Sequence, residues 1–379
     1  MRIAIVSEYY YPLLGGISEH VHFFAKECAN LGHQVTIITS APLLKSKNHQ
    51  PPDFITKTRI EIIRIGHGIP FYSNGSFANI SFGFGMKKQL RKILQKGKFD
   101  IVHIHSPAIP TLPILTQMVS EIPNIGTFHT YFEKNFLYAF YKNLIQDALG
   151  NLDGRIAVSK LCVETITRHI SAEFEIIPNG VDLEYFSKPQ GQLNKYKDGK
   201  INILFVGRLD PRNGLECLIK AYRQARKKNR NIRLIIIGDG PLRSYYNIIM
   251  KDEDDIHFEG YVNHLRPDYY LNCDIFCFPV QKASFGITIL EAMAASKPII
   301  CTDLPAFHDI LGKDQKACRY VDPFDPQAFA DKLTELIEDA SLRQTMGEVG
   351  FERVQRFSWP QVTKQVLEYY QKILATTGS

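Results

Sequence analysis

Hydrophobic positions along the chain fall into short runs that alternate with longer amphipathic stretches. In the first half, five β-branched runs predict buried strands, and residues 18–31 between the first two carry apolar side chains at helical spacing. Strands that alternate with helices predict βαβ units and a parallel sheet. The five runs are RIAIV (2–6), QVTIIT (34–39), IEIIRI (60–65), DIVHIH (100–105) and NIGTFH (124–129).

The same pattern restarts near residue 200. Helices are predicted over 215–228, 242–250 and 287–295, between the runs INILFVG (201–207), RLIIIG (233–238), IHFEG (256–260), DIFCFP (274–279) and KPIICTD (297–303). Two such series predict an α/β protein with two doubly wound, Rossmann-like domains. The turn-forming segment 177–186 sets the boundary, giving domains at 1–180 and 181–358. A final amphipathic helix over 359–374, within the C-terminal segment 359–379, is expected to pack back onto the first domain.

Composition is that of a globular protein, with 45% hydrophobic and 22% charged residues among 379. The longest apolar runs, such as 232–237, are too short to cross a bilayer, and the N-terminus shows no secretion signal, so a cytoplasmic location is expected. Seven cysteines are scattered along the chain. Cys273 and Cys277 are predicted on one face of a strand, where they pack in the core, and no metal site is predicted.

The basic residues concentrate in the first half. Residues 1–180 hold 18 Lys/Arg against 13 Asp/Glu, whereas the rest holds 27 against 26. This imbalance favours an anionic surface or ligand for the first half and argues against a general nucleic-acid binder. The segment MKKQLRKILQKGK (86–98) predicts an amphipathic helix with Lys87, Lys88, Arg91 and Lys92 on its polar face. Such a face is either simply solvated or meets an anionic membrane surface, and we favour the membrane.

Two motifs of the first domain are candidates for ligand contact. In LLGGIS (13–18), Gly15 and Gly16 would let the backbone approach a phosphate at the start of a helix, although a tight β-to-α turn would need the same residues. In GTFHTYFEKN (126–135), His129 follows a buried strand, where ligand-facing residues often lie in open α/β sheets. A structural role for His129 is equally compatible with the sequence.

Two further motifs belong to the second domain. In VGRLDPRNG (206–214), Arg208 and Arg212 could hold a diphosphate through bidentate hydrogen bonds, or could be surface residues of a turn. In KASFGITILEAMAASKP (282–298), Ser284 is predicted to cap a helix that begins near Gly286 and leaves amide groups pointing outward. Glu291 within that helix is expected either to form a salt bridge or to bind hydroxyl groups.

In this order, the motifs resemble family 4 of the glycosyltransferases, whose fold is called GT-B. Within that family the chain is most similar to bacterial phosphatidylinositol mannosyltransferases, and it also resembles enzymes that glycosylate diacylglycerol. The resemblance covers nearly the whole chain and is carried by GGISEHV (15–21), GTFHT (126–130), GRIAVS (154–159), IPNGVD (177–182), VGRLDPRNG (206–214), IGDGP (237–241) and SFGITILEAMAAS (284–296).

The resemblance implies a GT-B fold, with two Rossmann-like domains facing a central cleft, and a retaining transfer of a hexose. The donor would be a GDP- or UDP-sugar bound by the C-terminal domain, and the acceptor would be a membrane lipid or lipid-linked glycan bound by the N-terminal domain. Neither a metal nor another cofactor is expected. The basic helix would place the enzyme on the inner face of the cell membrane.

The family's functional residues carry over to matching positions of this chain. His129 would lie near the transferred sugar and the acceptor, and Arg208 would bind phosphate, so these two are the predicted catalytic residues. The predicted donor-binding residues are Gly15, Gly16, Arg208, Arg212, Ser284, the amides of Phe285, Gly286 and Ile287, and Glu291, which would bind the ribose.

The chain departs from the family pattern at two positions. Ala283 stands where the first Glu of the Glu-x7-Glu motif is expected, and Asn213 stands where a phosphate-binding Lys is expected. The adjacent Lys282 and Arg212 could compensate, so we expect activity with an altered sugar preference. Two alternatives stay open: a non-catalytic sugar-nucleotide-binding relative, and a sugar-nucleotide epimerase of the same fold. The epimerase would need a carboxylate acid/base pair, and no convincing pair is found in the sequence.

Overall fold

The chain forms two compact units in the computed structural model. Unit 1 comprises Met1–Gly180 together with Trp359–Ser379, and unit 2 comprises Val181–Ser358. The structure describes residues 1–12, 15–42, 60–73, 76–129, 146–147, 149–168, 171–191, 193–251, 253–262 and 265–377.

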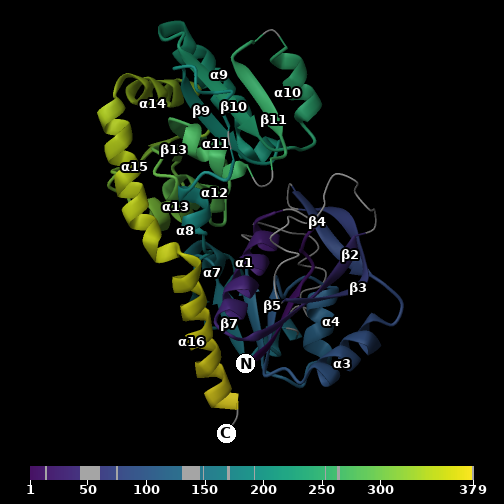
Figure 1. The fold of residues 1–379 in the computed structure, drawn as a ribbon. Coiled ribbons are helices and arrows are strands. Elements are labelled where there is room, and N and C mark those ends of the chain that lie inside the picture. Colours follow the sequence, from purple (N-terminus) through teal and green to yellow (C-terminus); the bar gives the residue numbers. More distant parts are fainter. Residues whose placement is uncertain are drawn as a thin grey trace. The chain divides into compact units, whose positions relative to one another are not determined.

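Unit 1 is built on an eight-stranded sheet with the strand order β4-β3-β2-β1-β5-β6-β7-β8 (Figure 1). Neighbouring strands are parallel except β3 and β4, which are antiparallel. The strands are β1 (Arg2–Ser7), β2 (Gln34–Pro42), β3 (Glu61–Ser73), β4 (Ser76–Phe82), β5 (Ile101–His105), β6 (Asn124–Phe128), β7 (Gly154–Ala157) and β8 (Glu175–Ile176). The helices described fully in this unit are α1 (Gly16–Asn30), α3 (Met86–Gly97), α4 (Leu112–Val119), α7 (Lys160–Ile166) and α16 (Trp359–Thr377).

Both faces of this sheet are covered. Successive side chains of a strand point to opposite faces, so Ile3 and Ile5 of β1 join one core and Ala4 and Val6 join another. The first core is closed by α1 and α16, which pack against each other, and the second by α3 and α4. The C-terminal helix α16 therefore belongs to unit 1, where its buried Tyr370 lies in the core.

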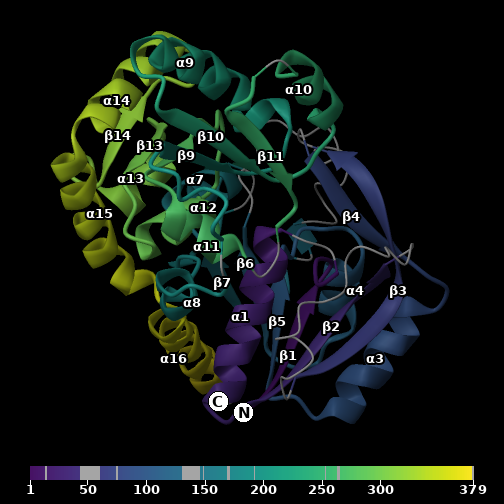
Figure 2. The same cartoon turned by 45° about the horizontal axis from the view of Figure 1, so that its top comes forward.

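Unit 2 is built on a six-stranded, fully parallel sheet with the order β11-β10-β9-β12-β13-β14. Helices α9 and α14 pack together over one face of it (Figure 2). The strands are β9 (Ile201–Val206), β10 (Ile232–Ile237), β11 (Ile256–Gly260), β12 (Ile275–Phe278), β13 (Ile299–Thr302) and β14 (Cys318–Val321). The helices are α8 (Leu183–Ser187), α9 (Leu215–Lys228), α10 (Arg243–Ile249), α11 (Arg266–Asn272), α12 (Ile287–Ala294), α13 (Pro305–Leu311), α14 (Pro326–Glu338) and α15 (Ala340–Val354), with 3-10 turns η1 (Pro211–Asn213) and η2 (Gln355–Phe357).

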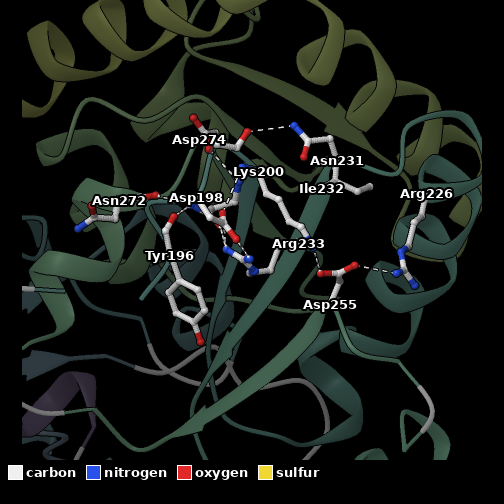
Figure 3. A network of polar contacts seen from close by, with 12 residues as sticks. Tyr196, Asp198, Lys200, Arg226, Asn231, Ile232, Arg233, Asp255, Asn272 and Asp274 are labelled. Atoms are coloured by element: carbon white, nitrogen blue, oxygen red, sulfur yellow. Dashed lines mark hydrogen bonds and ion pairs between the residues drawn. The ribbon is translucent and has the colours of Figure 1, made fainter. Parts of the chain in front are cut away.

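A polar network fixes the amino ends of the central strands of unit 2 (Figure 3). The Asp274 carboxylate accepts a hydrogen bond of 2.7 Å from the amide of Asn202, at the start of β9. The buried guanidinium of Arg233, on β10, pairs with Asp198. Just before β11, Asp255 is bound by Lys200 and Arg226. These contacts tie the strands of the sheet together at their amino ends.

The cysteine prediction was partly wrong. All seven thiols are free and buried, as core packing predicts. Cys273, however, is the C-terminal cap of α11 and precedes β12, so it does not share a strand face with Cys277. The predicted strands are all present, whereas β4, β7, β8 and β14 were not predicted.

No helix among the described residues combines the length and apolar character needed to cross a membrane.

A substitution at Gly238, directly after β10, can test how closely two loops of unit 2 approach each other. Its φ is +136°, and a Cβ there would lie 1.9 Å from the carbonyl oxygen of Gly207. Gly238→Ala should lower the free energy of unfolding by roughly 2–4 kcal/mol in urea titrations, from backbone strain and overpacking together. Gly199→Ala is the control, because Gly199 also has positive φ (+85°) but open space around it. Equal losses in the two variants would contradict the close approach.

Candidate functional site

The strand orders of the two sheets place a topological switch point in each unit. In unit 1 the order reverses between β1 and β5, and in unit 2 between β9 and β12. Open α/β sheets bind ligands beside the carboxyl ends of strands at such points. The candidate residues of each unit are therefore described at these edges.

In unit 2, three loops converge at the carboxyl ends of β9, β10 and β12. The amide of Gly207 donates to Ile237 (3.0 Å), and the amide of Leu209 donates to Asp239 (3.1 Å). The third loop joins through the amide of Gln281, which donates to the carbonyl of Arg212 at 2.8 Å. Backbone contacts thus bring the arginine motif, the GDGP turn and the segment before α12 into one place.

The turn that carries the two arginines is held by its neighbours. Asp210 caps η1 by accepting a hydrogen bond of 3.1 Å from the amide of Asn213. The Asn213 side chain donates in turn to the carbonyl of Arg208, at 2.7 Å. Arg208 and Arg212 are both half-buried. Asn213, which replaces the expected Lys, therefore fixes the backbone of Arg208 and does not supply a charge.

Burial raises the pKa of the Asp210 carboxyl, an effect opposed by the nearby Arg212. One Asp210 oxygen, Oδ2, is buried without a hydrogen-bond partner among the described residues. The carboxyl thus belongs to the turn that carries Arg208 and Arg212 and interacts electrostatically with both guanidinium groups.

Helix α12 begins at Ile287, two residues later than a Ser284 cap would place it. Its N-cap is Gly286, with a φ of +119°, and no side-chain cap hydrogen bond is formed. The prediction that Ser284 caps the helix was therefore wrong. Glycine is favoured at this position by the positive φ and by the ring of Phe307, which would lie 3.0 Å from a Cβ. The amides of Gly286 and Ile287 lie at the first turn, as the amide prediction requires.

Glu291 is buried inside α12, with 2% exposure. Arg266 lies 2.9 Å from its Oε1, and the hydroxyl of Tyr270 donates to its Oε2 at 2.7 Å. Of the two alternatives from the sequence, the salt bridge is thus present, and a phenolic hydroxyl is bound as well. The sequence reasoning missed Arg266 and Tyr270 because they lie 25 and 21 residues before Glu291, outside its motif.

In unit 1, His129 lies in a cluster of histidines that the sequence reasoning did not assemble. Its Nε2 is 2.9 Å from Nδ1 of His105, at the end of β5, and the two rings are stacked. The ring of His20, on α1, packs edge-on against His129 and bonds Asn179 through Nδ1 at 2.8 Å. His20 and His105 are buried, whereas His129 retains some exposure. Thr130 and the rest of the motif to residue 135 lie outside the described residues.

A fourth histidine anchors this cluster to the core. His103 precedes His105 by two residues, so both side chains lie on one face of β5 and stack with a centroid separation of 4.4 Å. Its Nε2 bonds Thr127 at 2.6 Å, and its Nδ1 bonds the hydroxyl of Tyr370, on α16, at 2.5 Å. The spacing HIH within a predicted strand was the signal that could have revealed the pair.

Burial keeps these imidazoles neutral. It lowers the pKa of His20 to about 4 and that of His103 to about 3. The pKa values of His105 and His129 lie well below the usual value for the same reason, and the neighbouring histidines lower them further. His129 is therefore neutral at physiological pH, suited to hydrogen bonding and not to acting as a cation.

Three of these histidines are the described residues that could hold a metal ion. One ring nitrogen each from His20, His105 and His129 lies within 4.8 Å of the others. Nitrogens bound to one ion at about 2.0–2.1 Å are at most about 4.2 Å apart, so the set would have to contract. The arrangement as it stands is a hydrogen-bonded cluster.

The glycine pair stands at the start of α1. Gly15 is the N-cap, with a φ of +153°, and Gly16 is the first helical residue. Among the described residues beyond its chain neighbours, no atom lies within 4 Å of where a Cβ of Gly15 would be. Leu13 and Leu14 of the motif lie outside the described residues.

The basic helix forms as predicted, as α3. Its four candidate side chains, Lys87, Lys88, Arg91 and Lys92, are exposed. Its apolar stripe of Met86, Leu90 and Leu94 is buried in the core of unit 1.

The histidine cluster makes stability depend on pH. Each buried histidine has a folded pKa below about 6.5, so the unfolded chain binds more protons once the pH falls below that value. The free energy of unfolding should therefore fall between pH 6.5 and about 4, by up to about 1.4 kcal/mol per pH unit for each histidine. In urea titrations, His103→Gln should make this slope shallower by roughly that amount. An unchanged slope in His103→Gln would contradict the assignment.

Comparison with known proteins extends over the whole chain. Residues 14–185 match the family model described as "Glycosyltransferase Family 4", and residues 189–353 match "Glycosyl transferases group 1". The phosphatidyl-myo-inositol mannosyltransferase of Mycobacterium leprae is 31% identical over 385 residues, covering 100% of this chain and 98% of the relative. The alpha-monoglucosyldiacylglycerol synthase of Acholeplasma laidlawii is 30% identical over 331 residues, covering 79% and 80%.

Solved structures show the same fold. The sucrose-phosphate synthase of Thermosynechococcus elongatus superposes with a TM-score of 0.74 at 20% identity, covering 99% of this chain and 100% of that chain. HepE of Anabaena, in complex with UDP and glucose, gives a TM-score of 0.77 at 16% identity, covering 98% and 99%. These GT-B neighbours, the two parallel sheets and the full-length relatives agree with the resemblance predicted from the motifs. The chain therefore belongs to family 4 of the glycosyltransferases and is a glycosyltransferase of the GT-B fold.

Proposed function

We propose that this glycosyltransferase moves a hexose from a GDP- or UDP-sugar to a lipid or lipid-linked glycan at an anionic membrane surface, with retention of configuration. The observation that carries the proposal is the convergence of the arginine turn, the GDGP turn and the start of α12 in unit 2, on a chain that matches a lipid mannosyltransferase along its whole length. Neither a metal nor another cofactor is needed for this chemistry.

Unit 2 would hold the donor. Arg208 and Arg212 would neutralise the departing diphosphate, with the amides of Phe285, Gly286 and Ile287 completing the cradle. Glu291 would accept hydrogen bonds from the ribose, held in position by Arg266 and Tyr270. Ser284, in the same segment, would also contribute to donor binding. Most of the catalytic effect would then come from positioning and from stabilising the leaving group.

Unit 1 would hold the acceptor and contribute to the reacting end of the donor. Gly15 and Gly16 would face the diphosphate at the start of α1, and His129 would hold the transferred sugar by hydrogen bonding in its neutral form. Lys87, Lys88, Arg91 and Lys92 would bring the protein to the inner face of the membrane, where its acceptor lies.

The departures at Ala283 and Asn213 favour a changed sugar preference over a lost activity. The Asn213 side chain donates a hydrogen bond to the carbonyl of Arg208. An inactive relative would have no need to keep this contact. Ala283 removes a carboxylate acceptor beside Lys282, and a Lys can only donate hydrogen bonds. The site is therefore suited to a modified or acidic sugar that presents acceptor atoms at this point.

His129 and Arg208 should fail in different ways when replaced. His129→Ala should lower turnover by about a hundredfold or more while donor affinity, measured by titration calorimetry, changes little. Arg208→Ala should weaken donor binding by roughly 1.5–3 kcal/mol, the worth of a charge-assisted hydrogen bond. His33→Ala, elsewhere in unit 1, is the control. Near-normal turnover in His129→Ala would make His129 structural, and unchanged donor affinity in Arg208→Ala would remove Arg208 from the donor site.

The proposed function is tested with a panel of UDP-, GDP- and ADP-sugars and a lipid extract as acceptor. Wild-type protein should form a glycolipid from one donor, whereas Lys282→Ala and Ala283→Glu should shift the preference among donors without abolishing transfer. Product formation would also eliminate the non-catalytic and epimerase alternatives. If no donor gives product and Ala283→Glu restores transfer, the natural chain is an inactive relative and the proposal fails.

A further inference from the structure

The histidine cluster of unit 1 contains a ring nitrogen whose isolation constrains the protons around it. Nε2 of His105 is buried and has no hydrogen-bond partner among the residues that the structure describes. The other nitrogen of that ring, Nδ1, lies 2.9 Å from Nε2 of His129. A buried pair of imidazoles with one nitrogen left unbonded has few ways to place its protons, so their positions can be deduced.

The pair shares a single hydrogen at its contact. Both imidazoles are neutral, because burial lowers their pKa values well below the usual value. A neutral imidazole has one N–H and one bare nitrogen. The hydrogen between Nδ1 of His105 and Nε2 of His129 therefore comes from one ring, and it decides where the proton of the other ring lies.

The isolated nitrogen selects between the two arrangements. If His129 donated to His105, the proton of His105 would be on Nε2, where it would have no acceptor. If His105 donates, its Nε2 is only an unused acceptor. Buried N–H groups without an acceptor are rarer in proteins than buried acceptors without a donor. His105 therefore donates from Nδ1, and the proton of His129 lies on its own Nδ1.

The side chain of Asn179 gives a second reason for this arrangement. Its Oδ1 accepts a hydrogen bond of 2.8 Å from Nδ1 of His20, since a carboxamide oxygen has no hydrogen to donate. Burial lowers the pKa of His129, and a hydrogen bond with the Asn179 side chain opposes this change. A hydrogen bond that favours the protonated imidazole is one in which the ring donates. Because Nε2 of His129 faces His105, the donating nitrogen is Nδ1.

The neighbours of His105 hold its ring in place. Its strand, β5, is paired on both sides, with β1 and with β6. The rings of His105 and His103 stack at a centroid separation of 4.4 Å, and those of His105 and His129 at 5.2 Å. The His20 ring packs edge-on against His105 at 5.2 Å and against His129 at 4.8 Å. The donor nitrogen of His105 is therefore fixed relative to His129.

His129 is the member of this cluster that a ligand can reach. The rings of His20, His103 and His105 are buried, whereas His129 retains some exposure at the carboxyl end of β6. Since the Asn179 oxygen already accepts the proton of His20, the N–H of His129 can exchange its contact with Asn179 for a ligand oxygen.

We propose that His105 fixes the tautomer of His129, so that His129 meets the transferred sugar as a hydrogen-bond donor through Nδ1. This rests on the proposed function, in which His129 holds the sugar, and adds the direction of that hydrogen bond. The partner on the sugar is then an oxygen that accepts, such as a hydroxyl or carboxylate oxygen. His105 is a positioning residue, because its buried ring acts on the sugar through His129.

Nuclear magnetic resonance of ¹⁵N-labelled histidines reads the tautomer directly, because a nitrogen that carries hydrogen and a bare nitrogen resonate far apart. At neutral pH, His105 and His129 should each carry hydrogen on Nδ1 and be bare at Nε2. The variants His105→Asn and His129→Gln assign the signals. Hydrogen on Nε2 of His129, alone or together with Nδ1, would overturn the proposal. The measurement needs no substrate.

Two variants test whether His105 sets the tautomer. In His105→Leu the donor is lost, so the Nε2–H form of His129 should appear. Turnover should then fall by about tenfold, the worth of one hydrogen bond, with little change in KM for the donor. His105→Asn can place an N–H near the position of Nδ1, so it should keep the Nδ1–H form and most of the turnover. An unchanged tautomer in His105→Leu, or equal loss of turnover in both variants, would show that His105 only packs.

His22→Leu is the matched control. His22 is also buried, on the same helix as His20, and its Nδ1 bonds the hydroxyl of Tyr10 at 3.0 Å. Its loss should leave the tautomer of His129 unchanged, and a change there would contradict a specific role for His105. Urea midpoints of all variants show that each is folded. If the wild type forms no product with any donor, the proposed function fails, and the resonances of His129 in wild type and His105→Leu still decide this proposal.

Discussion

The candidate donor site of unit 2 depends on one constraint, the contact of backbone with backbone at the carboxyl ends of β9 and β10. Gly207 and Gly238 lie so close that no side chain fits between them, and Gly214 lies equally close to the carbonyl of Pro279. These contacts place the arginine turn against the segment that precedes α12. The turn is positioned mainly by main-chain hydrogen bonds to the neighbouring loops. The polar network at the other edge of the sheet holds the strands that make this approach possible.

In unit 1, the surroundings of His129 keep its imidazole neutral. Four imidazoles share one small volume, and desolvation prevents each from taking up a proton. Several of their ring nitrogens bond Asn179, Thr127, Tyr370 or one another, whereas Nε2 of His105 is buried without a hydrogen-bond partner among the described residues. Since Tyr370 belongs to α16 and Asn179 to the IPNG segment, the end of the chain and the end of the first domain both support His129. The fold thus holds the His129 imidazole at the carboxyl end of β6 as a neutral polar group.

Much of the fold could be predicted because periodicity is a local property. Every predicted strand and helix is present, and α9 has the predicted bounds 215–228. Features that depend on distant partners could not be predicted. The strand β8 has two residues, too few for a pattern, and β14 (CRYV) is as long as β12 and β13 but has an Arg in its interior where those two are apolar throughout or nearly so. Glycine, not serine, caps α12 because the ring of Phe307 and a positive φ leave no room for a side chain, and neither is visible in the motif. The candidate residues were found by motif, whereas their supports, such as Arg266 for Glu291, come from other elements.

The helix α3 shows what an amphipathic pattern leaves open even where the helix itself is predicted correctly. Its sequence is amphipathic, and amphipathicity is compatible both with a membrane interface and with packing on a sheet. The apolar stripe cannot serve both, and Leu90 and Leu94 are committed to the core. The exposed part of the helix is its polar face, with Lys87, Lys88, Arg91 and Lys92. Any partner of this helix outside unit 1 would therefore meet its charges and not its apolar stripe.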